Sequence, residues 1–258
     1  MEIVVLLKQV PATESFISIA ENGTTINSED LKWVINPYDE LAVEEALKIR
    51  QASGGKVTVV SLGPEKTVEA IRTALAMGAD TGIRIDTGDL TPDGLNTARI
   101  LAGALKDISH DLIICGHRAV DDDNFQVGPA VAEFLNLPHI SMVVREEIEG
   151  NTIRCVTTVE GGTVELEAPL PALITTQRGL NEPRYASLPG IMKAKKKKID
   201  TRTLEDIGID MDALTPKINI AALQVPEDRK GGKIIEGETI EAKVAELVRL
   251  LRDETKVL

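Results

Sequence analysis

The sequence predicts an α/β protein built around a doubly wound parallel sheet. Short apolar runs, of the kind that is buried on both faces of such a sheet, alternate with amphipathic stretches along the first half of the chain. This order of strands and helices implies right-handed crossover connections. The chain has 258 residues, of which 43% are hydrophobic and 27% charged, so its composition is that of a folded globular protein rather than a disordered one.

Strands and helices are expected in alternation up to about residue 138. The expected strands are 2–8, 56–62, 82–86 and 111–115. The first helix should begin at Asn36-Pro37, because asparagine can cap free amides and proline suits the first helical position, and Gly54-Gly55 should end it. The later helices are expected from Val68 to Gly78, over residues 93–106, and around Val131, Phe134 and Leu135.

The pattern changes from about residue 139. Alternating runs at 152–160, 163–168 and 172–177 predict strands that extend or flank the sheet. Residues 179–200 are expected as an exposed loop and residues 201–237 as an extended arm, which a compact monomer does not need. An amphipathic terminal helix is predicted from Ile240, Val244, Leu247, Val248 and Leu251. We therefore expect a domain at 1–200 and an arm with its helix at 201–258.

Composition excludes several classes of protein. The net charge of −12 and the aromatic content of 2% argue against a nucleic-acid binder. Apolar runs are too short to insert in a membrane, and the start of the chain lacks a basic signal region, so we expect a protein that stays inside the cell. The two cysteines, Cys115 and Cys155, form neither a disulfide framework nor a metal-ligand pattern.

No motif for catalysis is present. Neither of the glycine-rich phosphate-binding patterns occurs, and the three histidines have no serine in a nucleophile-elbow context. We expect no catalytic residues and no metal site.

The segment 116–134, GHRAVDDDNFQVGPAVAEF, is the first candidate site. It joins an expected strand to an expected helix, at the sheet edge where open α/β sheets bind ligands. The amides of Gln126, Val127 and Gly128 open that helix and could hold a phosphate. Residues 121–123 are all aspartates; we interpret them as acidic residues near a helix start, because consecutive residues rarely face one Mg²⁺ ion.

The segment 180–200 is the second candidate. Lysine occupies five of the six positions from 193 to 198, on a chain whose net charge is −12. Such a run is usually only a solvated surface. Here it adjoins Leu188-Pro189 and Ile191-Met192, and an exposed apolar anchor ringed by cations is typical of a docking patch for an acidic protein.

Five sequence pieces together resemble one family. The pieces are VVLLKQV, INPYDELAVEEALKIR, TALAMGAD, GHRAVDDDN and, most specifically, NEPRYASLPGIMKAKKKK. The chain resembles the beta subunit of electron transfer flavoprotein from end to end. The resemblance implies an adenine-nucleotide-hydrolase-like α/β fold, a heterodimer with an alpha subunit that holds the redox-active FAD, and structural AMP in the beta subunit. It also implies an electron carrier without catalysis of its own, whose C-terminal arm packs on the alpha subunit.

The resemblance also implies roles for individual residues. The expected nucleotide contacts are Leu6, Asn36, Pro37, Tyr38, Asp39, Leu62, Gly116, His117, Arg118, Ala119, Val120, Asp121, Asp122, Asp123, Asn124, Phe125, Gln126 and Val127. Among them, Tyr38 matches the position whose ring lies near the flavin. The loop 181–198 would dock acyl-CoA dehydrogenases through Leu188, Pro189, Ile191, Met192, Lys193 and Lys196, of which the two lysines match positions methylated in some members.

The same resemblance implies that electrons pass on towards the quinone pool through an electron transfer flavoprotein–quinone oxidoreductase. The expected compartment is the cytoplasm of a bacterium, or the mitochondrial matrix if the source is a eukaryote.

Three alternatives remain open at this point. QVGP at 126–129 resembles the electron-bifurcating branch, whose beta subunit carries a second FAD in place of AMP. That branch has Gly and Ala where this chain has Asp122 and Phe125, so we expect AMP. A nucleotide-cleaving enzyme related to ATP pyrophosphatases would need an SGGxDS-like loop after the first strand, and this chain has KQVPATES there. A stand-alone nucleotide sensor would need neither the arm nor the lysine-rich segment.

Overall fold

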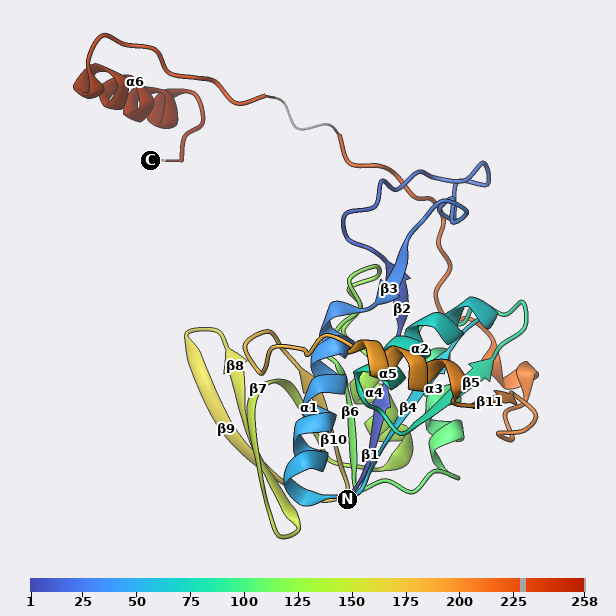
Figure 1. Ribbon diagram of the computed structural model, residues 1–258. Helices are drawn as coiled ribbons and strands as arrows, with labels where there is room; N and C mark the ends of the chain where they lie inside the picture. Colours follow the sequence, from blue (N-terminus) through green and yellow to red (C-terminus); the bar gives the residue numbers. More distant parts are fainter. Residues whose placement is uncertain (228–230, 258) are drawn as a thin grey trace. The chain divides into compact units, whose positions relative to one another are not determined.

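The computed structural model describes residues 1–227 and 231–257, in two compact units. The first unit, Met1–Ala222, contains a nine-stranded sheet in the order β11-β5-β4-β1-β6-β10-β7-β8-β9 (Figure 1). Parallel pairing joins β11 to β7, and antiparallel pairing adds β8 and β9 at one end. The expected doubly wound parallel α/β fold is therefore confirmed.

The strand boundaries follow the apolar runs closely in the first half of the chain. The parallel strands are β1 (Glu2–Leu6), β4 (Lys56–Leu62), β5 (Thr81–Asp86), β6 (Leu112–Gly116), β10 (Ala172–Thr176) and β11 (Ile199–Thr203). β7 (His139–Glu149), β8 (Thr152–Val159) and β9 (Gly162–Pro169) form the antiparallel extension, while β2 (Gln9–Pro11) and β3 (Trp33–Ile35) pair separately.

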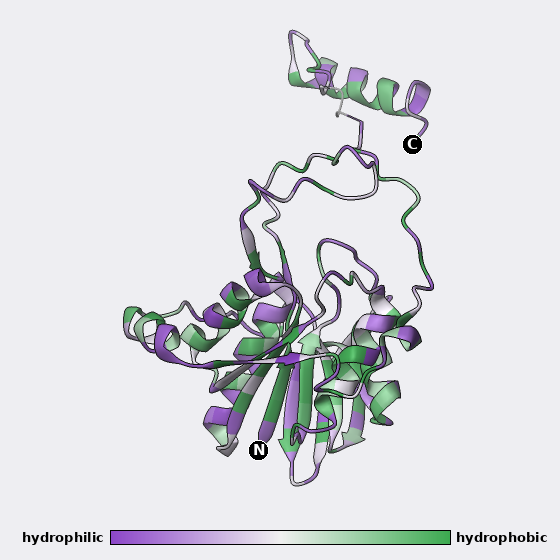
Figure 2. Ribbon diagram, turned by 90° about the vertical axis from the view of Figure 1, so that its right-hand side faces the viewer, coloured by the Kyte–Doolittle hydropathy of each residue, from purple (hydrophilic) through white to green (hydrophobic). Residues whose placement is uncertain are grey.

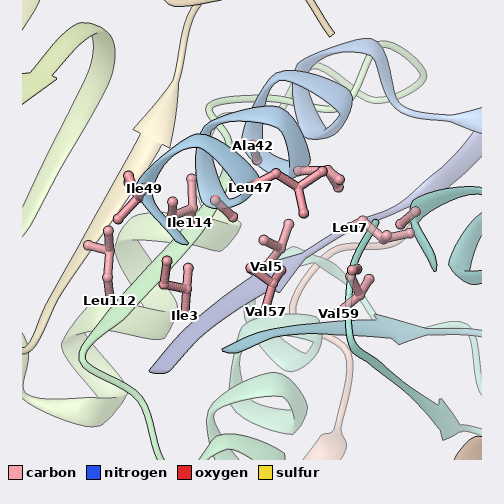
Figure 3. Packing of buried hydrophobic residues seen from close by; sticks show 14 of the residues in the cluster. Ile3, Val5, Leu7, Ala42, Leu47, Ile49, Val57, Val59, Leu112 and Ile114 are labelled. Atoms are coloured by element: carbon pink, nitrogen blue, oxygen red, sulfur yellow. The ribbon is translucent and has the colours of Figure 1, made fainter. Parts of the chain in front are cut away.

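Helices cover both faces of the sheet. α1 (Pro37–Ser53), α2 (Val68–Met77) and α5 (Leu188–Lys196) pack on one face, and α3 (Gly94–Leu105) and α4 (Val127–Leu135) on the other. Two short 3-10 turns, Glu65–Thr67 and Met211–Leu214, complete the first unit. In Figure 3 the side chains of Ala42 and Leu47 lie over Ile3, Val5 and Val57. Because side chains alternate along a strand, Val4 and Leu6 of β1 join the core on the opposite face.

The start of α1 agrees with the sequence in position but not in detail. Asn36 stands at the N-cap and Pro37 at the first helical position, as expected, and Gly54 ends the helix at φ 72°. The Asn36 side chain does not cap α1, which corrects the expectation. Its Nδ2 instead donates to the Arg118 carbonyl (2.8 Å) and its Oδ1 accepts from the Val120 amide (3.2 Å).

Residues 179–200 are not the continuous loop that the sequence predicted. Ser187 caps α5 by accepting from the Gly190 amide, and Pro189 lies in its first turn; both are helix-start signals that the lysine-rich composition concealed. β11 then pairs with β5. Leu204, Ile207 and Leu214 are buried in the core, so this unit extends to Ala222 rather than to the expected boundary at residue 200.

The second half of the sheet also differs from expectation. β10 lies inside the sheet between β6 and β7, whereas its sequence run was expected to extend or flank the sheet. β7, a strand of 11 residues, is not among the strands that the sequence predicts. Its end carries Arg145, Glu146, Glu147 and Glu149, and this charge masks the alternation of buried and exposed positions.

The second unit, Leu223–Leu258, contains the predicted terminal helix as α6 (Ile240–Asp253). Thr239 caps it by accepting from the Ala242 amide. Hydrophobic and hydrophilic segments both occur along α6 in Figure 2, whereas the sheet strands are largely hydrophobic. Ile240, Val244, Leu247 and Val248 are exposed, while Leu250, which the prediction omitted, is buried. Across the described residues, none of the helices has the length and apolar character needed to cross a membrane.

Candidate functional site

The candidate site lies where the carboxyl ends of the central parallel strands meet. From β1 the chain crosses to β4 on one side, and from β5 it returns to place β6 on the other side of β1. Such a switch in winding direction leaves a crevice beyond the strand ends, where open α/β sheets bind ligands. The start of α1, the segment 116–126 and the start of α4 surround this position.

Asp39 braces the site from within. Its Oδ2 accepts the Lys8 amide at 2.8 Å and its Oδ1 accepts the Gly116 amide at 2.7 Å, so it ties the start of α1 to the ends of β1 and β6. Burial raises the pKa of Asp39 to about 7, although these hydrogen bonds favour its charged form. Both carboxyl oxygens are engaged by the protein, and Asp39 therefore shapes the site as a support.

Gly116 has no room for a side chain where its amide meets Asp39. A Cβ there would stand 2.5 Å from Asp39 Oδ1 and 2.7 Å from Tyr38 Cβ. Close by, the Thr176 hydroxyl donates to the Tyr38 carbonyl at 2.7 Å, and the Thr176 carbonyl lies 2.9 Å from His117 Nδ1. The ends of β6 and β10 are thereby joined to α1 by buried polar groups.

Three rings and two arginines form a cluster beside the brace. The ring centroids of Tyr38 and His117 are 4.3 Å apart, and those of His117 and Phe125 are 5.3 Å apart. Burial lowers the pKa of His117. Arg118 donates to the Tyr38 hydroxyl at 2.9 Å and lies over the rings of Tyr38 and Phe125, and Arg178 also lies over the Tyr38 ring. The Tyr38 side chain is consequently buried.

The aspartates at 121–123 are paired with cations. Lys8 Nζ lies 2.8 Å from Asp121 Oδ1 and 2.9 Å from Asp122 Oδ2, while Arg118 lies 2.8 Å from Asp123. Partial burial lowers the pKa of Lys8, but Asp121 and Asp122 outweigh this effect and hold it above its usual value. Among the described residues no group of three or more His, Cys, Asp or Glu side chains is arranged to hold a metal ion.

The segment before α4 has an unusual backbone. The backbones of Asp123 (φ 46°) and Phe125 (φ 56°) adopt the left-handed conformation. Residues other than glycine rarely take this conformation, and it often marks binding sites. Phe125 remains 48% exposed. In the described structure no side chain caps α4, so the amides of its first turn, those of Val127 and the buried Gly128, lack the side-chain acceptor that often satisfies a helix start. Arg118 Nε is also buried without a hydrogen-bond partner among the described residues.

The structure thus brings most of the expected nucleotide-site residues to one edge. Leu6 and Leu62 stand at the ends of β1 and β4, and residues 36–39 and 116–127 enclose the same edge. Sequence reasoning missed Lys8 and Arg178. The signal for Lys8 was its place just past the first apolar run, opposite an acidic segment that needs a cation.

The expected docking segment is exposed, as predicted. Leu188 is 81% exposed and Met192 61%, on a helix whose outer surface also carries Lys193 and Lys196. Pro189 and Ile191 are exposed as well. This helix packs on α2, away from the strand ends where the expected nucleotide contacts lie.

A separate hollow of about 250 Å³ lies between α1 and β7. Glu45, Lys48 and Ile49 of α1 line it, with Arg145 and Glu146 of β7 and Leu180. Burial, followed by a hydrogen bond to Glu45, raises the pKa of Glu146 to about 7.

Comparison with known proteins identifies the family. The family described as "Electron transfer flavoprotein domain" matches residues 23–207. The electron transfer flavoprotein subunit beta of Bacillus subtilis is 41% identical over 260 residues, covering 100% of both chains. The subunits beta of Bradyrhizobium diazoefficiens (38% identical, 100% of both chains) and Homo sapiens (36% identical, 97% of this chain and 99% of the relative) are also similar.

The chain belongs to the electron transfer flavoprotein family, as a beta subunit. The match to the electron transfer flavoprotein domain spans the ends of β4 and β6, the start of α1, the segment 116–127 and helix α5, whereas β1 with Leu6, and Lys8 after it, precede the matched residues. Helix α5 and most residues of the first candidate site therefore lie inside the region that the family model matches.

Proposed function

We propose that this chain pairs with an alpha subunit that holds FAD, and that it binds AMP structurally at the carboxyl edge of its sheet. The observation that supports nucleotide binding most directly is the start of α4, which no side chain of the described residues caps; Arg118 Nε, buried without a hydrogen-bond partner among these residues, adds to it. The Val127 and Gly128 amides would receive the phosphate. Leu6 and Leu62, at the ends of β1 and β4, would lie against the adenine.

The charge balance of the site suits a phosphate. Lys8 neutralises Asp121 and Asp122, and Arg118 neutralises Asp123, so the three carboxylates do not oppose an anion at full strength. Asp39, Asn36 and Gly116 would hold the surrounding backbone in place and would take no part in electron transfer. FAD, in the alpha subunit, would supply the electron transfer, and this chain would contribute no catalytic residue.

Tyr38 is our proposed neighbour of that flavin. Its ring lies beneath Arg118 and Arg178, which would face the flavin from this subunit. Reduced flavins carry negative charge, and two guanidinium groups would stabilise that charge where it develops.

Helix α5 is the proposed docking surface for acyl-CoA dehydrogenases. Leu188 would be the apolar anchor, and the surrounding lysines would attract an acidic partner. Electrons would then continue through an electron transfer flavoprotein–quinone oxidoreductase to the quinone pool. This function belongs in the bacterial cytoplasm, or in the mitochondrial matrix of a eukaryote.

Nucleotide content tests the proposal. The heterodimer, produced by coexpression with its alpha subunit, is denatured and the released nucleotides are quantified by chromatography and mass spectrometry. We expect one FAD and one AMP per heterodimer. Release of FAD alone, at one per heterodimer, would contradict AMP binding, and ATP cleavage by the purified heterodimer would favour the pyrophosphatase-like alternative.

A second candidate is the bifurcating function, with a second FAD in this subunit. The start of α4, which has no side-chain cap in the described structure, would also accept a pyrophosphate. Lys8 pairs with Asp122 and so reduces the repulsion between that carboxylate and the phosphates. The remaining obstacle is Phe125, whose ring lies 5.3 Å from that of His117 and narrows the space beyond the AMP position.

The variant Phe125→Ala separates the two candidates. If AMP is the native ligand, we expect the wild type to bind one FAD even in excess FAD, and the variant to gain measurable affinity for a second. The flavin-to-protein ratio after reconstitution reports this. Phe134→Ala, which removes a ring from the other end of α4, is the matched control. Two flavins in the wild type would establish the bifurcating function instead.

A further inference from the structure

We propose that Arg72 and Glu44 are positioning residues for partner docking: they hold α5 and the segment leading to it in one place on α2 and α1. The inference rests on the proposed docking function of α5. It adds that the docking surface is preformed before the partner arrives, and it assigns that task to residues outside the exposed segment.

Arg72 fixes the C-terminal end of α5. It lies on α2, and its Nη1 donates to the carbonyls of Ala194 (2.7 Å), Lys197 (3.3 Å) and Lys195 (3.4 Å). The last carbonyls of a helix have no partners within the helix, and a cation suits that end of the helix dipole. Lys197 Nζ adds a bond in the same region by donating to the Ala79 carbonyl at 2.5 Å.

Close packing fixes the middle of α5. A Cβ on Gly190 would collide with the carbonyl oxygen of Ala76, so the backbone of α5 lies directly on the end of α2. Ala194, one turn later, is buried in the core. Small residues therefore form the inner surface of the helix, and the larger Leu188 and Met192 remain outside.

Glu44 fixes the segment that leads into α5. Its buried carboxylate accepts from Arg184 Nε (2.8 Å), from Arg184 Nη2 (2.8 Å) and from the Arg184 backbone amide (3.1 Å). Bidentate pairs of this kind fix orientation as well as distance. Asn181 strengthens the attachment by donating to Glu45 Oε2 (2.6 Å) and to the Leu41 carbonyl (3.0 Å).

The attachments act at both ends and in the middle of one short segment, residues 181–197. A surface that is already ordered loses less conformational entropy when a partner binds, and it binds more tightly for that reason. Removing an attachment should therefore weaken docking while the exposed contact residues stay unchanged. Chemistry after docking should keep its rate, because the flavin is untouched.

The test uses the FAD-loaded heterodimer and a medium-chain acyl-CoA dehydrogenase reduced by octanoyl-CoA. For Arg72→Ala we expect a KM for the heterodimer at least threefold above wild type, with kcat unchanged. Arg72→Lys, which keeps the charge, should recover part of the loss. Glu44→Gln should shift KM in the same direction, and it serves as the second variant if Arg72→Ala folds poorly.

Arg99→Ala is the matched control, because Arg99 also donates to a distant backbone carbonyl, that of Ala213 at 2.6 Å, but on the other face of the sheet. Its KM should equal that of wild type. Hydrogen exchange of residues 188–196 in the heterodimer gives a readout that needs no dehydrogenase. Arg72→Ala should accelerate exchange there, and Arg99→Ala should not.

Two outcomes would overturn the inference. If Leu188→Ala raises KM but Arg72→Ala and Glu44→Gln change neither KM nor exchange in α5, then docking stands and the positioning role is wrong. If Leu188→Ala leaves KM unchanged with every dehydrogenase tried, then the docking function itself fails, and the positioning role fails with it.

Discussion

Single residues at the nucleotide edge show how far sequence reasoning extends. Asn36 and Asp39 were correctly placed at the start of a helix, but their side chains serve the neighbouring strands and loop rather than the helix amides. Lys8 could be chosen as the partner of Asp121 only when the fold brought them together, across 113 positions of sequence. Contacts at such separation depend on strand order, which no local pattern contains.

Glu146 makes a pH dependence predictable at this scale. Burial, a hydrogen bond to Glu45 and repulsion from Glu45 raise its pKa to about 7, from an ordinary value near 4.5, while Lys48 opposes the shift and Glu147 adds to it. The folded chain therefore holds a proton that the unfolded chain releases between these values. The contribution of Glu146 to the free energy of unfolding should therefore be fully present below pH 4.5, and it should be lost as the pH rises through about 7.

Glu146→Gln should consequently stabilise the protein at pH 8 and change little at pH 5. A full shift of this size corresponds to ~3 kcal/mol, and partial solvent exposure reduces the expected gain to about 1 kcal/mol. Urea denaturation at the two pH values measures it, with Glu149→Gln, an exposed residue of the same strand, as control. A gain of equal size at both pH values would argue against the raised pKa of Glu146.

Whole elements were predictable where hydrophobic pattern and boundary residues agreed. The strand at 56–62 was placed without error, because its apolar run is bounded by Gly55 and by Gly63-Pro64. Helix α5 was missed because lysines dominate its composition, although Ser187 and Pro189 mark its start. β7 was missed because its charged residues hide the alternation. In both elements few side chains are buried. Those of α5 become evident from its packing on α2, and those of β7 from its pairing with β10.

The exposed side of α5 gives a prediction at the scale of one element. Leu188→Ala should weaken dehydrogenase docking about thirtyfold, since truncating a central anchor commonly costs ~2 kcal/mol. Flavin content should stay unchanged, because Leu188 makes no part of the nucleotide edge. Steady-state reduction of the heterodimer measures the effect. Ser187→Ala, which removes the helix cap instead of the anchor, separates loss of contact from loss of helix.

The whole molecule divides at a place that the sequence did not indicate. The sequence predicts an extended arm from residue 201, but the body continues to Ala222, because Leu204, Ile207 and Leu214 complete its core. These apolar residues are too few and too irregularly spaced to signal burial. Among the described residues of the second unit, Ile240, Val244, Leu247 and Val248 of α6 remain exposed, as expected for a helix that packs on an alpha subunit.

Two truncations test this division. Removing 223–258 should leave the body folded, with its thermal unfolding temperature nearly unchanged, but should prevent a stable complex with the alpha subunit. Removing 201–258 should also destabilise the body, because it deletes three buried core residues and strand β11 beyond Asp200. Calorimetry and size-exclusion chromatography after coexpression measure the two effects. A stable heterodimer formed by the shorter deletion would show that the arm is dispensable.

The insertion of β10 between β6 and β7 constrains the order in which the sheet can be completed during synthesis. When the first 138 residues have left the ribosome, β6 is still an open edge with unpaired backbone groups. β7, β8 and β9 emerge next, yet they cannot join, because their place is reached only through β10. At ~5–20 residues per second, the wait lasts a few seconds. A nascent β6 edge of this kind is a natural point for chaperone binding, and for mispairing between neighbouring chains on one messenger RNA.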